Sequence, residues 1–240
     1  MSSPKLHEFQ SREDLATTLA AEVEKASIVE QKRAILAFSG GSTPERMLGK
    51  VNRIDNSIIL LVDDRWVDTN SSRSNEAMLR KQLGISQSIT TSEDLARMSS
   101  TPSPAIVPLY RDGVSAAEAC FTLNMLVDDL NIEVPDMCIL GMGTDGHTAS
   151  WFPGGDNLSA ATAPNCKDHY MPMTAPGAQE PRITMTLPFV ASSKKLILHI
   201  EGAEKRSVLE QALQDGPADE LPVRNILRKK DANLQIYWAP

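Results

Sequence analysis

Several residue types that often define a protein class are scarce in this sequence. Aromatic residues make up 5% of its 240 positions, and there are only three cysteines and four histidines. No run of apolar residues approaches the roughly 20 that a helix needs to span a bilayer. The first residues also lack the apolar core of a secretory signal. We therefore expect a cytoplasmic protein with no membrane contact.

Cysteine and histidine are placed in ways that do not indicate a metal site. Cys120, Cys138 and Cys166 lie far apart and include no C-x-x-C pair, so neither a disulfide framework nor a thiolate zinc site is predicted. The histidines show no H-x-x-x-H or equivalent ligand spacing. We expect reduced, structural thiols and chemistry that uses no metal.

Positive charge is also in short supply. The chain has 24 Lys and Arg against 31 Asp and Glu, a formal net charge of -7 at pH 7. Proteins that bind nucleic acid normally present a basic face, so we expect no nucleic-acid partner. Any anionic ligand must be small and must be held by cations gathered locally.

The chain does contain a series of short, continuous apolar runs. They are AILAF (34–38), IILLV (58–62), MCIL (137–140), LILHI (196–200) and LQIYW (234–238). Continuous apolar runs are typical of strands buried on both faces of a parallel sheet. These runs therefore predict the strands of such a sheet.

Helical patterns alternate with these runs, at residues 11–30, 115–130 and 203–213. The first begins with a capping pattern at Ser11 and Asp14, whereas residues 86–103, rich in Ser, Thr and Pro, indicate a surface loop. The alternation predicts one α/β domain over residues 1–240. Its sheet is expected to be doubly wound and mostly parallel, with helices on both faces.

Polar motifs follow two of the apolar runs, at the strand ends where open α/β sheets bind ligands. After the first run come Gly40, Gly41, Ser42 and Thr43. Glycines let a ligand approach the backbone, and the N–H groups at a helix start attract anions. The alternative is a tight turn, without a ligand, capped by Ser42 or Thr43.

After the second run come Asp63, Asp64 and Arg65. The carboxylates can position a water molecule or a sugar hydroxyl, and Arg65 can pair with an anion or a developing oxyanion. The alternative for this motif is a solvated cluster of charges.

The motif GMGTDGH (141–147) has the glycine spacing of a dinucleotide fingerprint. That fingerprint must open a helix, but a Pro-Gly-Gly break at Pro153 follows soon after, so a nicotinamide oxidoreductase is disfavoured. Asp145 and His147 stand two residues apart and can present an imidazole whose tautomer or proton is set by the carboxylate. A structural histidine is the alternative.

Taken together, these motifs resemble those of the 6-phosphogluconolactonase family, whose superfamily also contains glucosamine-6-phosphate deaminase. The likeness runs from AFSGGSTP through LVDDRWV, SSRSN, GMGTDGHTASWFPG and PRITMTL to EGAEKR and LPVRNIL. The family triplet Asp-Glu-Arg is here Asp63-Asp64-Arg65, which leaves the role of Asp64 open. The resemblance implies a Rossmann-like fold similar to that of the deaminase. It also implies hydrolysis of 6-phospho-glucono-δ-lactone, without a cofactor, in the oxidative pentose phosphate pathway.

The resemblance also implies roles for individual residues. The loop at residues 40–43 would lie against the sugar phosphate, and Arg182 and Lys205 would bind phosphate or other substrate charge. His147 would be the general base that activates water, with Asp145 orienting it. Arg65 or N–H groups of the turn would hold the oxyanion, and Asp63 would belong to the same catalytic group.

Two further functions stay open beside the lactonase. In the deaminase branch the histidine is followed five residues later by a glutamate, where this chain has Phe152, which cannot transfer a proton. A sugar-phosphate sensor would usually carry a DNA-binding segment, and we see no room for one before the first helix. We expect an enzyme whose partner is a small sugar-phosphate lactone, and the sequence does not predict its oligomeric state.

Overall fold

A large parallel sheet forms the centre of the computed structural model, which describes residues 4–98 and 102–240. Its eight strands follow the order β1-β11-β10-β7-β2-β3-β6-β5. They are β1 (Lys5–Glu8), β2 (Ala34–Phe38), β3 (Ser57–Leu61), β5 (Gln87–Ser88), β6 (Ala105–Val107), β7 (Met137–Leu140), β10 (Leu196–Glu201) and β11 (Leu234–Ala239). A smaller antiparallel sheet, of order β4-β9-β8, contains β4 (Asp63–Arg65), β8 (Tyr170–Met173) and β9 (Arg182–Met185).

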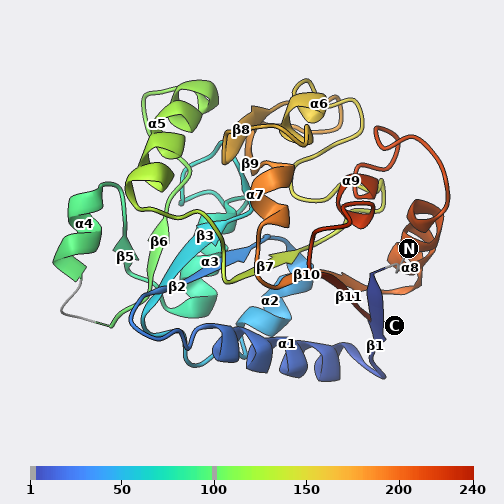
Figure 1. Cartoon of the computed structure of the whole chain (residues 1–240), viewed down its shortest axis with the longest axis horizontal. Helices are drawn as coiled ribbons and strands as arrows, with labels where there is room; N and C mark the ends of the chain where they lie inside the picture. Colours follow the sequence, from blue (N-terminus) through green and yellow to red (C-terminus); the bar gives the residue numbers. More distant parts are fainter. Residues whose placement is uncertain (1–3, 99–101) are drawn as a thin grey trace.

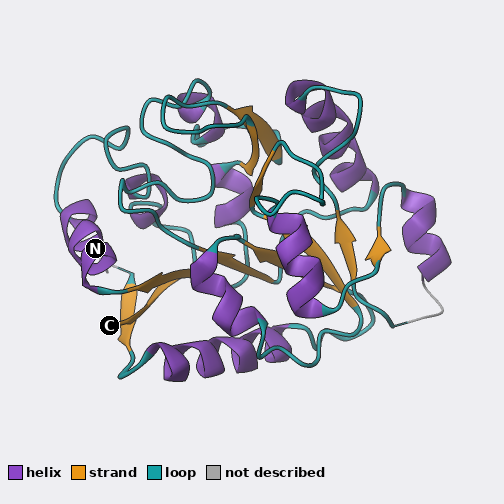
Figure 2. Ribbon diagram, turned by 180° about the vertical axis from the view of Figure 1, so that it is seen from behind, coloured by secondary structure: helices purple, strands orange, loops and turns teal. Residues whose placement is uncertain are grey.

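Helices cover both faces of the large sheet. They are α1 (Arg12–Ala26), α2 (Ser42–Leu48), α3 (Asn75–Leu83), α4 (Ser92–Arg97), α5 (Ala116–Asp129), α6 (Leu158–Ala161), α7 (Leu187–Ala191), α8 (Ala203–Leu213) and α9 (Arg224–Leu227). Figure 1 shows α1 along one side of the sheet and α5 and α7 on the other. The predicted doubly wound architecture is thus confirmed, and the first and last strands, β1 and β11, pair side by side at one edge of the large sheet (Figure 2). Within the described residues, no helix is both long and apolar enough to cross a bilayer.

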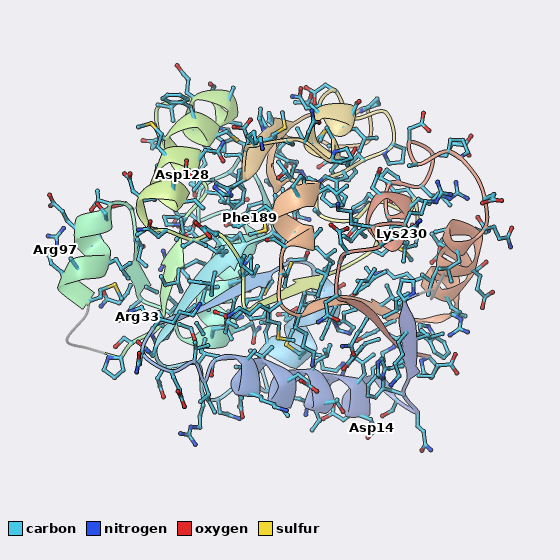
Figure 3. The ribbon with its side chains drawn as sticks, in the orientation of Figure 1. Asp14, Arg33, Arg97, Asp128, Phe189 and Lys230 are labelled. Carbon is cyan, nitrogen blue, oxygen red and sulfur yellow. The ribbon has the colours of Figure 1, made fainter. Side chains whose placement is uncertain are left out.

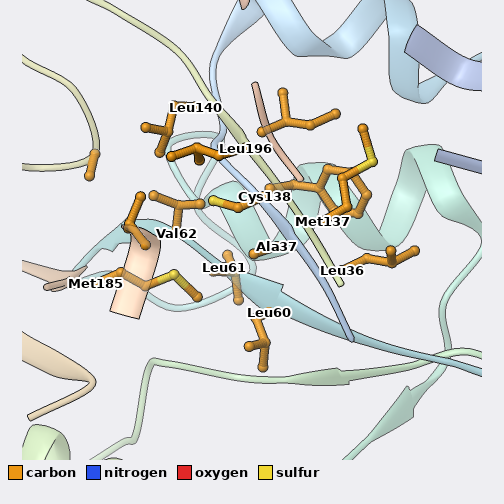
Figure 4. Close-up of a cluster of buried hydrophobic side chains, with 14 of the residues drawn as sticks. Leu36, Ala37, Leu60, Leu61, Val62, Met137, Cys138, Leu140, Met185 and Leu196 are labelled. Atoms are coloured by element: carbon orange, nitrogen blue, oxygen red, sulfur yellow. The ribbon is translucent and has the colours of Figure 1, made fainter. Parts of the chain in front are cut away.

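The apolar runs form the central strands because both of their faces are covered. All five residues of β2 and all five of β3 are buried. Figure 4 shows Leu36 of β2, Leu61 of β3 and Met137 of β7 in one cluster of apolar side chains. Truncating a buried leucine such as Leu36 to alanine would cost about 2–5 kcal/mol. Charged side chains such as Asp14 and Lys230 point outward instead (Figure 3).

Element boundaries agree closely with the predicted runs, with two corrections. The helix predicted over residues 11–30 starts after its Ser11 cap but ends at Ala26, because the Ser27 N–H closes the last turn on the Val23 carbonyl. The segment predicted as a loop, 86–103, instead contains β5 and α4, which begins with a Thr91–Asp94 capping box. Residues 99–101 of that segment lie outside the described residues.

The strand order locates a switch point in the large sheet. From β2 the chain proceeds through β3 to β6 in one direction, whereas β7, β10 and β11 extend the sheet from the other side of β2. The loops that follow β2 and β7 therefore diverge and leave a crevice at the carboxyl ends of these strands. Ligands of open α/β sheets bind in such a crevice.

Candidate active site

A cavity of about 210 Å³ lies at this switch point. The site residues predicted from the sequence all line it except Asp145, which contacts His147, and Asp64. Lining residues that the sequence motifs did not single out include Asn75, Met142 and Ala149. The cavity therefore brings together motifs that are far apart in the sequence.

His147 is presented by a tight turn, residues 141–147, that follows β7; we call it the histidine turn. Its Nδ1 lies 2.5 Å from Oδ1 of Asp145, and the same oxygen accepts a 3.2 Å hydrogen bond from the His147 backbone N–H. Gly143 N donates to the His147 carbonyl at 2.9 Å, and Gly146 N donates to the Gly143 carbonyl at 3.1 Å. The imidazole is thus fixed both through its ring and through its backbone.

Two of the glycines in this turn are needed for packing. A Cβ on Gly143 would lie 2.3 Å from the His147 ring and 2.5 Å from Asp145 Oδ1. Gly146 has a φ of 75°, and a Cβ there would lie 2.5 Å from Leu221. The spacing that mimics a dinucleotide fingerprint therefore serves a turn that encloses an imidazole, and the next helix starts only at Leu158.

The carboxylate beside His147 determines which ring nitrogen can act as a base. Burial alone would raise the pKa of Asp145, but the hydrogen bond and charge of His147 outweigh burial, and the pKa is lowered. The ionised carboxylate can only accept, so Nδ1 carries a proton, and in the neutral imidazole the lone pair is therefore on Nε2. The pair is suited to proton transfer through Nε2.

The glycine loop, residues 40–43, forms another wall of the cavity. Gly41 occupies the N-cap position of α2 with a φ of 97°, and within the described chain no side chain caps this helix. The Thr43 hydroxyl instead accepts a 3.1 Å hydrogen bond from Nζ of Lys205. A cap by the side chain of Ser42 or Thr43 is therefore absent from the described part of the chain, and Thr43 instead faces Lys205 of α8.

Two arginines enter the cavity from the smaller sheet, where Arg65 of β4 pairs with Arg182 of β9. Arg182 is 8% exposed; burial lowers its pKa, and the charge of Asp63 opposes that shift. The Arg182 guanidinium lies 5.3 Å from the centre of the Phe152 ring, and its Nε has no hydrogen-bond partner in the described part of the chain. A bound anion would offset the desolvation of this cation.

Asp63 supplies the carboxylate that lines the cavity. Its Oδ2 accepts a 2.6 Å hydrogen bond from Ser150 Oγ, and the backbone N–H of Ser150 is held by Thr184 Oγ1 at 3.1 Å. Among the described lining residues, three cations stand against this single carboxylate: Arg65, Arg182 and Lys205. The cavity is thus locally positive in a chain of net charge -7.

Asp64 does not line the cavity, which corrects the prediction that both carboxylates could meet a ligand. Its oxygens accept hydrogen bonds of 2.7, 2.8 and 2.9 Å from the backbone N–H groups of Arg65, Asn75 and Glu76. Burial raises the pKa of Asp64 to about 6, although these three N–H groups oppose the shift. Asp64 is therefore a buried anchor for the start of α3.

Phe152 contacts two of the functional side chains. Its ring centroid lies 4.5 Å from that of His147, in addition to its contact with Arg182. The sequence identified Phe152 only as a replacement for glutamate, so its bridging contacts come from the structure. An aromatic ring supports both neighbours without competing for their protons.

The remaining histidines lie elsewhere. His169 pairs with Asp128 at 2.9 Å, His199 lies buried 3.2 Å from Glu201, and His7 packs against Tyr237. Across residues 4–98 and 102–240, no group of three or more His, Cys, Asp or Glu side chains is placed to hold a metal ion. Metal-free chemistry stays a prediction.

Known proteins of one family are similar to this chain over nearly its whole length. Residues 10–238 match the model of the family described as glucosamine-6-phosphate isomerases/6-phosphogluconolactonase. The chain belongs to this family. The 6-phosphogluconolactonase of Rhizobium meliloti is 38% identical, with 99% of this chain and 100% of that protein covered. The one from Pseudomonas aeruginosa is 31% identical, over 98% of this chain and 94% of that protein.

Solved structures of family members have the same fold. A 6-phosphogluconolactonase from Shewanella baltica superposes with a TM-score of 0.80 at 26% identity, covering 100% of this chain and 99% of that chain. A monomeric glucosamine-6-phosphate deaminase gives a TM-score of 0.74 at 17% identity, covering 98% and 97%. The second likeness concerns the fold alone.

Proposed function

We propose that this protein hydrolyses 6-phosphogluconolactone to 6-phosphogluconate, a step of the oxidative pentose phosphate pathway. The observation that carries the proposal is the His147–Asp145 contact of 2.5 Å in a cavity that also holds three cations. An oriented base serves ester hydrolysis, and local cations serve a phosphorylated substrate. The relatives at 38% and 31% identity support the same reaction.

In this mechanism His147 moves the protons. Nε2 takes a proton from water as the water oxygen bonds to the carbonyl carbon of the lactone. The carbonyl oxygen gains negative charge, which Arg65 or N–H groups of the histidine turn stabilise. When the carbonyl re-forms, the ring C–O bond breaks and the departing oxygen takes the proton from the imidazolium. The new carboxylic acid then releases a proton to solvent.

Asp145 and Asp63 act beside the base in this scheme. Asp145 orients the neutral ring and stabilises its protonated form. Asp63 is held by Ser150 and is placed to orient the attacking water or a sugar hydroxyl. Neither carboxylate forms a covalent bond to the substrate.

In this scheme the cations bind the phosphate end of the substrate, away from the lactone carbonyl. Lys205, Arg182 and the glycine loop would bind the phosphate, because backbone N–H groups and ammonium or guanidinium groups are the usual phosphate donors. Binding the phosphate at a distance from the carbonyl aligns the lactone with the water, so that affinity is converted into orientation.

The family also includes glucosamine-6-phosphate isomerases, and Phe152 favours the lactonase over that activity. Aldose–ketose isomerisation needs a second group to shuttle protons, whereas the Phe152 ring beside His147 can neither accept nor donate one. Lactone hydrolysis requires only one base and one water.

The test is to follow two reactions with the same purified protein. Freshly generated 6-phosphogluconolactone is assayed with spontaneous opening subtracted, and glucosamine 6-phosphate is assayed for released ammonia. We expect lactone opening well above the buffer rate and no ammonia. Ammonia release, with lactone opening no faster than buffer, would overturn the assignment.

A further inference from the structure

Asn75 contacts two of the segments that line the cavity, β4 and the glycine loop. Its Nδ2 donates to the Asp63 carbonyl at 2.9 Å, and its Oδ1 accepts from Nη1 of Arg65 at 3.0 Å. Its side chain also packs against Gly40, where a Cβ would lie 2.0 Å from Asn75 Cγ. Asn75 is 4% exposed, so these contacts are shielded from bulk water.

The orientation of the Asn75 amide is fixed by its partners. A guanidinium can only donate and a carbonyl can only accept, so the amide oxygen must face Arg65 and the amide nitrogen must face Asp63. The backbone is fixed as well, since Asn75 N donates to buried Asp64 at 2.8 Å and the Ser74 hydroxyl caps α3 by accepting from Ala77 N. Asn75 is therefore a rigid point to which a flexible arginine is attached.

Arg65 is positioned through one of its terminal nitrogens. Nη1 donates to the Arg73 carbonyl at 2.7 Å as well as to Asn75, which uses both of its N–H groups. Nη2 makes no hydrogen bond within the described residues, and Arg65 lines the cavity. The protein thus holds the guanidinium by Nη1 alone, because the buried Nε also has no hydrogen-bond partner within the described residues.

We propose that Asn75 is a positioning residue, which fixes the Arg65 guanidinium and the glycine loop at one spacing across the cavity. The inference rests on the proposed function, because it gives Arg65 a role toward the anionic substrate. Asn75 itself touches no reacting atom. It acts through Arg65 on one side and through the close approach of Gly40 on the other.

The first test pairs Asn75 with Arg65. Lactone kcat/KM and the Kd of 6-phosphogluconate are measured for the wild type, Asn75→Ala, Arg65→Ala and the double variant. We expect each single variant to lose about 10- to 100-fold in kcat/KM, because a hydrogen bond to a charged group is lost or the cation is removed or misplaced. If Asn75 acts through Arg65, the double variant should be no worse than Arg65→Ala.

The second test pairs Asn75 with Gly40. Gly40→Ala places a methyl group on the Asn75 amide and should lower kcat/KM or prevent folding, whereas in an Asn75→Ala background the methyl group finds vacated space. The double variant Gly40→Ala/Asn75→Ala should therefore fold and match Asn75→Ala. Gly177→Ala is the matched control, because a Cβ there meets nothing within 4 Å.

These measurements separate failure of the inference from failure of the proposed function. A wild type that neither opens the lactone nor binds 6-phosphogluconate would contradict the function. An active wild type would contradict the inference if Asn75→Ala kept wild-type kcat/KM, if the Asn75 and Arg65 losses multiplied, or if Gly40→Ala stayed as harmful without the Asn75 amide. A purely structural Asn75 would lower the melting temperature without coupling to Arg65.

Discussion

The histidine turn and the glycine loop face the same cavity but treat their charged groups in opposite ways. On the turn, His147 is bound at 2.5 Å to its own carboxylate. By contrast, Lys205 donates to a hydroxyl of the loop and Arg182 packs on the Phe152 ring, and neither forms a salt bridge within the described residues. In the proposed mechanism the turn moves a proton, whereas the cations bind the ligand.

This contrast predicts different kinetics for substitutions on the two sides. Removing a group that acts only on the transition state lowers kcat. Removing a group that binds a remote phosphate equally in the ground state and the transition state raises KM.

The largest expected effect is that of His147→Ala. We expect kcat to fall by roughly 10²-fold or more, with the fold intact, because the general base is removed. His169→Ala is the matched control, since His169 lies outside the cavity. Steady-state lactone kinetics and thermal unfolding check the result. A folded variant with wild-type turnover would remove His147 from the mechanism.

Asp145→Asn should give the next largest loss in kcat, about 10-fold, with little change in KM. The amide keeps the shape of the side chain but loses the charge that stabilises the protonated imidazole, and it can present a donor to Nδ1. The same kinetic assay checks this prediction. An effect confined to KM would mean that Asp145 serves substrate binding and not proton transfer.

Lys205→Ala and Arg182→Ala should each raise KM, by about 10-fold, and leave kcat nearly unchanged. Inorganic phosphate and 6-phosphogluconate should inhibit the wild type competitively. Lys230→Ala, which removes an exposed cation outside the cavity, is the control. If neither anion competes with the lactone, the cations have been assigned to the wrong ligand.

Product affinity should also depend on pH through Lys205. Burial lowers the pKa of Lys205, and the charges of Glu201 and Glu204 oppose that shift. Its positive charge is therefore lost at a lower pH than that of a free lysine, so the inhibition constant of 6-phosphogluconate should rise as pH increases through that range. Lys205→Arg should move the rise to higher pH, and Lys205→Ala should abolish it. A rise that persists in Lys205→Ala would point to another group.

The smallest effect is expected for substitution of Phe152, whose ring contacts both His147 and Arg182. Phe152→Leu removes its ring contacts with His147 and Arg182 and should lower kcat/KM by about threefold to tenfold, the range of a partly buried cation–π contact. Phe152→Tyr keeps the ring and should stay closer to wild type. Equal losses in the two variants would contradict a role of the ring contacts, because Phe152→Tyr keeps them.

Five adjacent strands of the large sheet, β11-β10-β7-β2-β3, and most of the cavity could be predicted from the sequence because simple rules apply to them. Strands buried on both faces give continuous apolar runs, as in residues 34–38, and parallel strands end at one edge, which brings Gly40 and His147 together. The smaller sheet could not be predicted, because its strands are too short for a pattern to stand out: DDR has three residues, none of them apolar, and RITM has four.

The contacts that support the lining residues of the cavity could not be predicted from the sequence either. Asn75 appeared only inside the motif SSRSN, and its contact with Gly40 requires the three-dimensional approach of α3 to the glycine loop. The role of Asp64 was left open by the sequence, since only the structure shows its oxygens occupied by N–H groups at the start of α3.

The division between the two sides can be tested most directly by removing the phosphate from the substrate. Opening of 6-phosphogluconolactone and of unphosphorylated glucono-δ-lactone is compared for the wild type, Lys205→Ala and His147→Ala. The enzyme concentration is chosen so that the catalysed rate exceeds the rate of spontaneous opening in buffer. We predict that Lys205→Ala lowers kcat/KM about tenfold for the phosphorylated lactone but changes it less than about twofold for the other. His147→Ala should slow both by roughly 10²-fold. Equal slowing of both lactones by Lys205→Ala would contradict the separation of phosphate binding from chemistry.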